Sequence, residues 1–295
     1  MEQITKTENG LLVRAPAKIN LSLLIAGKRS DGFHEIETVM AKVDLYDELV
    51  FEFSDKEGFE LVCQGKYWAP DGRDNLVYQA CKMLCDTAKV TPNVKITLTK
   101  NIPPGSGLGG GSSDAAAGLI GLNKFAGLGI CQSDLEKTAA RIGSDVVFFL
   151  GSPLAFCTGR GEKIKKIKKN FSFQAILLLP NVNVSTKKVY ENYIHNQALF
   201  NELSNRINPH IREKKIDLIA KMCANMLLTS CFGLYQELAD LKSRIEALGI
   251  NPVGLSGSGS AMYYLAGTDE NSLEHYQSML RSIDCESVIV NNNRW

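Results

Sequence analysis

The sequence lacks an excess of charge of either sign. Its 295 residues include 33 Lys and Arg against 32 Asp and Glu, which gives a formal net charge of +1. At this balance neither a nucleic acid nor a membrane surface would be held by bulk electrostatics. We therefore expect no nucleic-acid or membrane partner, and any phosphate must be bound by a local site.

Long apolar runs and clustered cysteines are also missing. Residues 1–8 are polar and lack the apolar core of a signal peptide, and the longest apolar runs, such as Ala175 to Leu179, have the length of a strand. The cysteines are scattered, and Cys81 and Cys85, which share a helical pattern, have no histidine or acidic cluster nearby to complete a metal site. These absences predict a cytoplasmic protein whose cysteines are reduced and buried.

Glycine, by contrast, is concentrated in one loop. Five glycines occupy the seven positions 105–111, between the alternating strand pattern of residues 94–100 and the small apolar residues 115–125. This order predicts a strand, a glycine loop and a helix capped by Ser112 or Ser113. Glycine N–H groups at a helix N-terminus bind anions, so we expect the loop to hold a phosphate; a flexible linker is the alternative.

Other nucleotide motifs fail. The sequence has no Gly-x-x-x-x-Gly-Lys-Ser/Thr loop and no catalytic or metal-binding loop of a protein kinase. Gly105, Gly107 and Gly110 match the dinucleotide fingerprint, but that motif expects an acidic residue roughly 20 positions later, where this sequence has Gly-Ile-Cys-Gln at 129–132. An ATP-dependent phosphotransferase is the class that remains.

The length and the 44% hydrophobic content favour two domains. We place their boundary at the lysine-rich stretch 163–169, predicted to be a solvated edge, so that the domains span 1–160 and 161–295. In the first domain the patterns predict strands over 11–25, 38–44, 48–53, 59–64 and 94–100, a helix capped by Asp74, a helix that starts with a capping box at Ser133–Glu136 and stops at Gly143, and an apolar strand over 144–150. In the second they predict strands over 173–179, 261–266 and 287–290, helices over 185–194, 215–228, 235–248 and 272–282, and an unclear segment at 196–214.

Four polar residues have two readings each. Lys18 and Asn20 are two apart on one strand face, either exposed to solvent or facing a cleft together. His34 follows an aromatic residue in a turn and is either a surface residue, which is the more frequent case, or a ligand-binding one. Asp145 stands before an apolar run, either in a turn or ion pair or as a site carboxylate.

Three motifs resemble those of the GHMP kinases and occur in the same order. They are Pro16-Ala17-Lys18-Ile19-Asn20-Leu21, the glycine loop Pro103 to Ala117, and Gly254 to Ser260. Asp31-Gly32-Phe33-His34 and Gly143-Ser144-Asp145-Val146 further resemble the branch that phosphorylates a cytidine-diphosphate-linked methylerythritol in the non-mevalonate isoprenoid pathway. The similarity spans nearly the whole chain and is weakest over 160–250.

This resemblance implies an α+β fold of two domains with the active site in the cleft between them. The N-terminal domain would be of the ribosomal-protein-S5-domain-2 type, with a left-handed β-α-β crossover that departs from the usual right-handed rule. The C-terminal domain would be ferredoxin-like. The reaction would transfer the γ-phosphate of ATP to the 2-hydroxyl of the methylerythritol part.

The resemblance also assigns residues. Lys18 and Asp145 fall on the catalytic lysine and aspartate, with Asp145 as the base that Lys18 keeps ionised. Mg²⁺ would bridge the phosphate oxygens, with Ser113 as a hydroxyl ligand. The acceptor substrate would be bound by Asn20, Phe33, His34 and Tyr190, with the cytosine between aromatic rings. ATP would be bound by Pro103, Pro104, Gly105, Ser106, Gly107, Leu108, Gly109, Gly110, Gly111, Ser112, Ser113, Asn75, Leu76 and Lys100.

Two departures and three alternatives accompany this interpretation. Val147 stands where relatives often carry proline, and Tyr190 lies in the weakly matching region. Another GHMP kinase of the homoserine or mevalonate type would have no use for Phe33, His34 and Tyr190, which suit a flat base. A silent binding relative would be expected to lose Lys18 or Asp145. An ATP-dependent decarboxylase of the superfamily is the third. The sequence does not indicate an oligomeric state.

Overall fold

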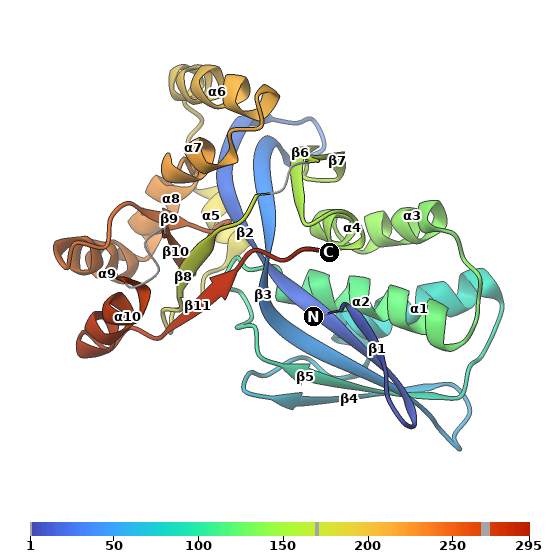
Figure 1. Ribbon diagram of the computed structural model, residues 1–295. Helices are drawn as coiled ribbons and strands as arrows, with labels where there is room; N and C mark the ends of the chain where they lie inside the picture. The colour runs from blue at the N-terminus through green and yellow to red at the C-terminus, as the bar shows by residue number, and fades with distance from the viewer. Residues whose placement is uncertain (1, 169–170, 267–271) are drawn as a thin grey trace.

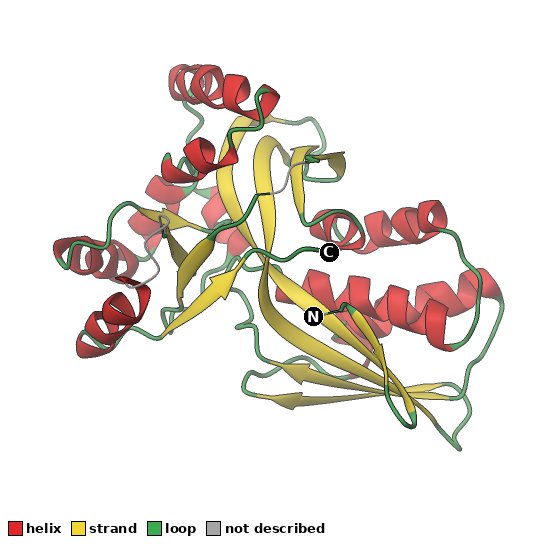
Figure 2. Ribbon diagram, viewed as in Figure 1, coloured by secondary structure: helices red, strands yellow, loops and turns green. Residues whose placement is uncertain are grey.

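The computed structural model describes residues 2–168, 171–266 and 272–295 (Figure 1). Within these ranges it has a seven-stranded sheet, with β1-β2-β3-β5-β4 in order and β6 and β7 attached to β3, and a four-stranded sheet in the order β11-β8-β10-β9. Figure 2 shows helices beside both sheets. The strands are β1 Ile4–Lys6, β2 Gly10–Lys28, β3 His34–Phe53, β4 Phe59–Gly65, β5 Val94–Lys100, β6 Leu154–Gly159, β7 Lys163–Lys166, β8 Gln174–Leu178, β9 Val253–Leu255, β10 Met262–Leu265 and β11 Ser287–Asn291. The helices are α1 Leu76–Ala88, α2 Gly110–Phe125, α3 Gln132–Ile142, α4 Ser144–Leu150, α5 Thr186–Glu191, α6 Gln197–Arg212, α7 Ile216–Lys221, α8 Leu228–Leu234, α9 Gln236–Ala247 and α10 Ser272–Ser282.

The long hairpin of β2 and β3 runs through the centre of the molecule (Figure 1). The two separate strands predicted over 38–44 and 48–53 were wrong, because β3 is continuous. Its register shifts where Pro16 pairs with Tyr46 and Ala17 with Val43. Such a bulge absorbs the polar residues between the two predicted strands without ending the strand.

The first half of β2 and its second half contribute to different cores. Leu11 and Val13 pack in the core that includes α1 and α2, whereas Ile19 and Leu21 pack in the core that includes the four-stranded sheet. Lys18 and Asn20 alternate with these second-half residues. They therefore lie where the two halves of the molecule meet.

The glycine loop lies between β5 and α2, as predicted. Helix α2 starts at Gly110 after Gly109, whose φ is 73°, so the predicted cap at Ser112 or Ser113 was wrong. Glycine adopts this left-handed conformation without strain, which lets the chain turn directly into the helix. The two serines lie inside the first turn, where capping is no longer needed.

Two other predicted caps were wrong. The cap of α1 is Asn75 and not Asp74, because the Asn75 side chain accepts a hydrogen bond from the Val77 N–H, while Asp74 ends a short 3₁₀ helix over Gly72–Asp74. Helix α3 starts one residue before the predicted box, with Cys131 in the cap position and no side-chain cap. Its predicted end at Gly143 is confirmed.

The apolar run after Asp145 is a helix and not the predicted strand. In α4 the side chains of Val146, Phe148 and Phe149 are buried in the core that α2 shares. β-branched and aromatic residues have only a modest helix penalty, which the burial of three such side chains outweighs. As a consequence Asp145 lies in the first turn of a helix.

The crossover from β4 through α1 to β5 joins parallel strands, as the fold implied by the resemblance requires. The left-handedness of this crossover remains a prediction.

The segment 196–214, for which the sequence patterns made no clear prediction, contains α6. The single helix predicted over 215–228 was wrong, since α7 and α8 are separate. The α+β fold class is confirmed.

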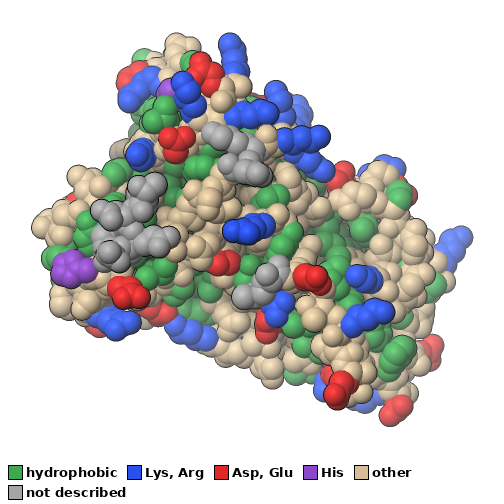
Figure 3. All heavy atoms as spheres, viewed as in Figure 1, with side chains coloured by type: hydrophobic (Ala, Val, Ile, Leu, Met, Phe, Trp, Pro, Cys, Tyr) green, Lys and Arg blue, Asp and Glu red, His purple; other side chains and the backbone are tan. Residues whose placement is uncertain are grey.

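The lysine-rich stretch forms the exposed edge strand β7, which pairs with β6 in the seven-stranded sheet. Figure 3 shows Lys and Arg side chains on the surface in this region. Lys169 lies outside the described residues. Because β7 belongs to the first sheet, we propose a domain division just after residue 166 in place of 160/161.

No helix in the described part of the chain is long and apolar enough to cross a membrane.

Candidate active site

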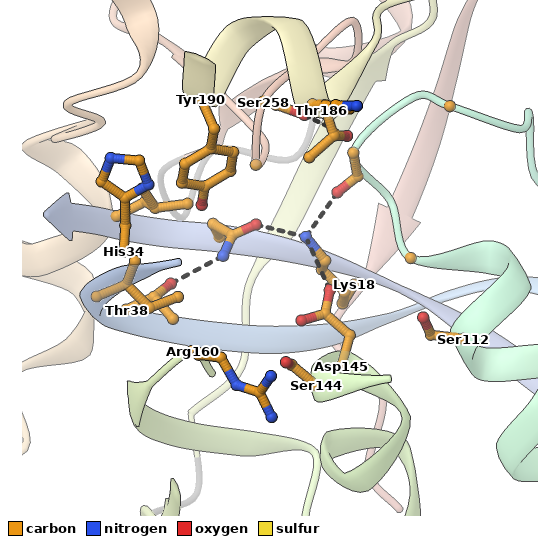
Figure 4. Close-up of a pocket in the computed structure, with 18 of the residues that line it drawn as sticks. Lys18, His34, Thr38, Ser112, Ser144, Asp145, Arg160, Thr186, Tyr190 and Ser258 are labelled. Atoms are coloured by element: carbon orange, nitrogen blue, oxygen red, sulfur yellow. Dashed lines mark hydrogen bonds and ion pairs between the residues drawn. The ribbon is translucent and has the colours of Figure 1, made fainter. Parts of the chain in front are cut away.

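A cavity of about 930 Å³ lies between the glycine loop, the β2-β3 hairpin, the start of α4 and helix α5. Figure 4 shows side chains from these elements pointing into it. Most of the residues that the sequence singled out line this cavity: Lys18, Asn20, Phe33, His34, Leu76, Pro103, Pro104, Gly105, Ser106, Gly107, Gly109, Gly110, Gly111, Ser112, Asp145 and Tyr190.

Lys18 is held in the cavity by several polar contacts. It is 4% exposed, and its Nζ donates to Asn20 Oδ1 at 2.5 Å and to the Gly107 carbonyl at 2.7 Å. Asp145 Oδ2 lies 4.0 Å from the same nitrogen. The ammonium thus joins β2, the glycine loop and α4 at one point.

Burial and charge act in opposite directions on Lys18. Burial lowers the pKa of Lys18 below its usual value, and the Asp145 carboxylate acts against this lowering. The Asp145 side chain is 37% exposed and faces the cavity (Figure 4). A half-buried carboxylate beside a buried ammonium is suited to accept a proton from a bound hydroxyl group.

The Asn20 side chain has a fixed orientation. Its Nδ2 donates to Thr38 Oγ1 at 2.8 Å, and the Thr38 hydroxyl donates to the Ser22 carbonyl at 2.6 Å. Since Nδ2 must donate to this hydroxyl, Oδ1 is the atom that faces Lys18. Thr38, which sequence reasoning missed, therefore orients the lysine through Asn20; one β-strand threonine among many offers no signal for this role.

Aromatic rings gather at the other end of the cavity. The His34 ring lies 5.3 Å from the Tyr190 ring and 5.7 Å from the Tyr193 ring, measured between centroids. Phe33 is 53% exposed, and the Arg160 guanidinium carbon lies 4.8 Å from its ring centroid. Burial, with the charges of Lys28 and His195, lowers the pKa of His34, which favours a neutral imidazole that can both donate and accept. Tyr193 and Arg160 were also missed, although Tyr193 is three residues beyond Tyr190.

The second glycine-rich motif, Gly254 to Ser260, holds the loop from the opposite side. Ser256 Oγ donates to the Gly107 carbonyl at 3.0 Å, and the Ala261 N–H donates to the Ser106 carbonyl at 2.9 Å. A Cβ at Gly107 would lie 2.1 Å from the Ser256 carbonyl oxygen. Only glycine permits this contact, so the two glycine-rich segments pack backbone to backbone.

Four of the predicted ATP residues do not line the cavity. The Asn75 amide is occupied as the α1 cap and by a bond to the Pro70 carbonyl, and Leu108 is buried. Lys100 binds Asp47 and Asp114 in the core. Ser113 is 1% exposed, and its hydroxyl has no hydrogen-bond partner in the part of the chain that the structure describes.

Lys100 contrasts with Lys18 in its charge environment. Burial by itself would lower the pKa of Lys100, but Asp114 and Asp47 raise it above its usual value. Asp47 Oδ1 also accepts hydrogen bonds from the N–H groups of Asn101 and Ile102. The lysine therefore fixes the start of the glycine loop from behind and does not line the cavity.

Proteins of similar sequence and fold are known for almost the whole chain. The family described as GHMP kinases N terminal domain matches residues 75–152. A protein of Bacillus cereus (strain B4264) named 4-diphosphocytidyl-2-C-methyl-D-erythritol kinase is 40% identical over 91% of this chain and 92% of its own. A crystal structure of 4-(cytidine 5'-diphospho)-2C-methyl-D-erythritol kinase has a TM-score of 0.75 at 30% identity, covering 96% of this chain and 100% of the other. A homoserine kinase from Cytophaga hutchinsonii has a TM-score of 0.75 at 18% identity over 98% and 96% of the two chains, and it shares the fold.

Proposed function

The chain belongs to the 4-diphosphocytidyl-2-C-methyl-D-erythritol kinase family of the GHMP kinases, and we propose that it transfers the γ-phosphate of ATP to the 2-hydroxyl of that cytidyl compound. One observation carries the proposal. A single cavity has the Lys18–Asp145 pair at one end and the His34–Tyr190 ring pair at the other. A substrate with a polyol at one end and a flat base at the other fits this arrangement. The enzyme would act in the cytoplasm on this small molecule.

The Lys18–Asp145 pair carries the chemistry. Phosphoryl transfer passes through a loose transition state, so alignment and charge stabilisation contribute most of the catalysis. The Asp145 carboxylate accepts the proton of the 2-hydroxyl as its oxygen bonds to the γ-phosphorus and ADP leaves. Lys18 keeps this carboxylate ionised and, from its fixed position on Asn20 and Gly107, orients the hydroxyl.

The glycine loop and the N-terminus of α2 bind the triphosphate. The lining residues of 103–112 present backbone close to the cavity, and the positive end of the helix dipole favours phosphate there. Leu76 is the predicted ATP-side residue outside the loop that reaches this cavity. Asn75 and Lys100 support the site through the cap of α1 and the base of the loop.

The residues present also fit Mg²⁺, which keeps few protein ligands when it binds with nucleotide phosphates. The orphaned Ser113 hydroxyl and the cavity-lining Ser112 hydroxyl, both in the first turn of α2, are the two candidates to hold it. Mg²⁺ would neutralise phosphate charge. Comparing Ser112→Ala with Ser113→Ala decides between them. The variant that loses the Mg²⁺-binding hydroxyl should need several-fold more Mg²⁺ for half-maximal turnover, and the other variant should match the wild type.

The aromatic end recognises the cytosine. Stacking on an aromatic ring contributes about 1–3 kcal/mol per base. Tyr190→Ala should therefore raise the KM for the cytidyl substrate by roughly 5- to 100-fold while the KM for ATP stays within twofold. Equal changes in both KM values would remove Tyr190 from the cytosine site.

The decisive experiment offers the purified protein ATP and Mg²⁺ with cytidyl-methylerythritol, homoserine, mevalonate or galactose in turn. ADP release with the cytidyl compound alone is expected. Diphosphomevalonate, assayed for carbon dioxide release, tests the decarboxylase alternative. Turnover of any other acceptor without turnover of the first would overturn the proposal, and no turnover at all would indicate a silent relative.

A further inference from the structure

Arg160 is a cation in the cavity that the mechanism above does not use. It lies in the tight turn between β6 and β7, lines the cavity and is half-buried. Its neighbour Gly161 brings the turn to Asp145, because a Cβ at Gly161 would lie 3.6 Å from Asp145 Oδ1. The other end of the Arg160 side chain lies on the ring of Phe33.

The nearby acidic groups are bonded to other partners. Glu162 accepts the N–H of Arg160 itself at 2.5 Å, and Glu35 accepts the Gly159 N–H at 3.1 Å. The second oxygen of Glu35 and the carboxylate of Asp31 bind Arg29. Two carboxylates thus fix the backbone of the turn without neutralising the guanidinium.

The guanidinium therefore has free donors. Among residues 2–168, 171–266 and 272–295 the guanidinium makes no hydrogen bond or ion pair. It lies over the face of Phe33, and the Asp31 carboxylate, which is bound to Arg29, is near enough to interact with it through charge alone. A cation held on an aromatic face keeps its N–H groups in the ring-parallel plane available to a ligand. A planar fork of this kind matches two phosphate oxygens.

The position of Arg160 indicates which phosphate it binds. The turn that carries Arg160 lies against Asp145, and the guanidinium lies on the Phe33 ring, so Arg160 stands between these two residues. Figure 4 shows Arg160 beside Ser144 and Asp145, on the opposite side of the cavity from Tyr190 and Thr186. A ligand with its base at the rings and its hydroxyl at Asp145 must place the group that joins them between these two ends. We propose that Arg160 binds the diphosphate of the acceptor substrate and so selects a nucleoside-diphosphate-linked alcohol; this rests on the function proposed above.

Two other cations in the cavity are weaker candidates. Lys187 lies 3.8 Å from Glu191 and is largely exposed. Lys28 is exposed at the end of β2. Among the described residues neither lies on an aromatic ring as Arg160 does on Phe33, and an ammonium on a flexible side chain loses more side-chain entropy per hydrogen bond than a planar guanidinium. Lys187→Met is therefore a matched control.

The test compares two probes that differ only in the diphosphate. With the ATP site filled by a non-hydrolysable ATP analogue, calorimetry measures the Kd of cytidine diphosphate and of cytidine. We expect Arg160→Met to weaken cytidine diphosphate roughly 10- to 100-fold, the range for charge-assisted hydrogen bonds. Cytidine should change less than threefold. Arg160→Lys should recover part of the loss, and Lys187→Met should leave both probes near wild type.

Each other outcome has a defined meaning. Equal weakening of both probes would overturn the proposal, because Arg160 would then act on the base site through Phe33. A raised KM for ATP with unchanged cytidine diphosphate binding would also overturn it, since the guanidinium would serve the ATP phosphates. If the wild type binds neither probe, the proposed function itself fails, and that result does not depend on Arg160.

Discussion

Lys18 and Lys100 are both 4% exposed, yet their surroundings are opposite. Lys18 faces neutral oxygens and one carboxylate at 4.0 Å that is open to the cavity. Lys100 is bound between Asp47 and Asp114, which are 0% and 3% exposed. The pKa of Lys18 is lowered, chiefly by burial, whereas that of Lys100 is raised by its two carboxylates against the effect of burial.

The comparison separates a reactive lysine from a structural one. A carboxylate that is half-exposed can exchange protons with a ligand, and an ammonium that it does not fully neutralise retains charge for that ligand. A buried lysine between two buried carboxylates forms a closed ion network. Removing the lysine leaves the buried carboxylates without a compensating charge. We therefore propose that the same residue type supports turnover in one place and folding in the other.

Asp145→Asn tests the reactive side and should give the largest effect. Loss of the base should lower kcat by roughly 10²- to 10⁴-fold, the usual contribution of general base catalysis. ATP binding and the free energy of unfolding should stay close to wild type, because Asp145 is half-exposed. Steady-state kinetics, nucleotide titration and urea unfolding measure the three quantities. Near-normal turnover would remove Asp145 from the mechanism, and Lys18 could then no longer be contrasted with Lys100 as the reactive lysine.

Lys100→Met tests the structural side. Asp47 and Asp114 would remain buried without their cation, which costs about 3–5 kcal/mol of unfolding free energy. The exposed pair of Lys66 and Glu286 provides a control, and Lys66→Met should cost at most about 1 kcal/mol. Urea unfolding compares the two variants.

The kinetics of Lys100→Met sharpen the distinction further. A rise in KM for ATP with stability unchanged would return Lys100 to the nucleotide site that the sequence predicted for it. A stability loss no larger than that of Lys66→Met would show that the buried network does not support the fold.

Lys42 extends the comparison to a buried lysine that forms no ion pair with a carboxylate among the described residues. It is 1% exposed and donates to the carbonyls of Phe149 and Gly151 at the end of α4, the helix that carries Asp145. Burial, with a smaller effect of Lys166, lowers the pKa of Lys42 from 10.5 to about 7. Between these values the unfolded chain binds a proton that the folded one does not, so stability should rise with pH.

The contribution of this lysine is therefore present above pH 10.5 and is lost as the pH falls toward 7. The unfolding free energy of the wild type relative to Lys42→Met should increase from pH 7 to pH 9.5, measured by urea unfolding at both values. A difference that does not change with pH would show that Lys42 stays charged. Either result shows whether Lys42 is charged at the end of α4. Of the effects expected for the Asp145, Lys100 and Lys42 variants, this one is the smallest.

Local sequence patterns predicted the helices and strands in which apolar residues recur at a regular spacing. β5 was predicted with its observed ends, and the glycine loop was placed between its strand and helix because five glycines exclude ordinary packing. The patterns failed where tertiary contacts overrode local preference. Phe148 and Phe149 favour a strand by composition, and their burial in the core they share with α2 makes them part of α4.

The residues of the candidate site, like the secondary-structure elements, were predicted in part. Lys18, Asp145, His34 and Tyr190 were named from motifs, and the fold brings them to one cavity. Thr38, Tyr193 and Arg160 were missed because nothing in their own segments distinguishes them. Lys100 was assigned to ATP from the family resemblance, and the sequence could not show that Asp47 and Asp114 lie beside it.

By itself the sequence determined that a glycine loop stands between a strand and a helix, and its motifs predicted a phosphate there and named Lys18 and Asp145 for the transfer, because glycine spacing and residue type are properties of the chain. Only the tertiary structure decided how each lysine is charged and where it points. Those properties depend on burial and on partners such as Asp47, which is 53 positions from Lys100. The electrostatic energy of a lysine is set by the groups within a few ångströms of it, and folding alone brings them there.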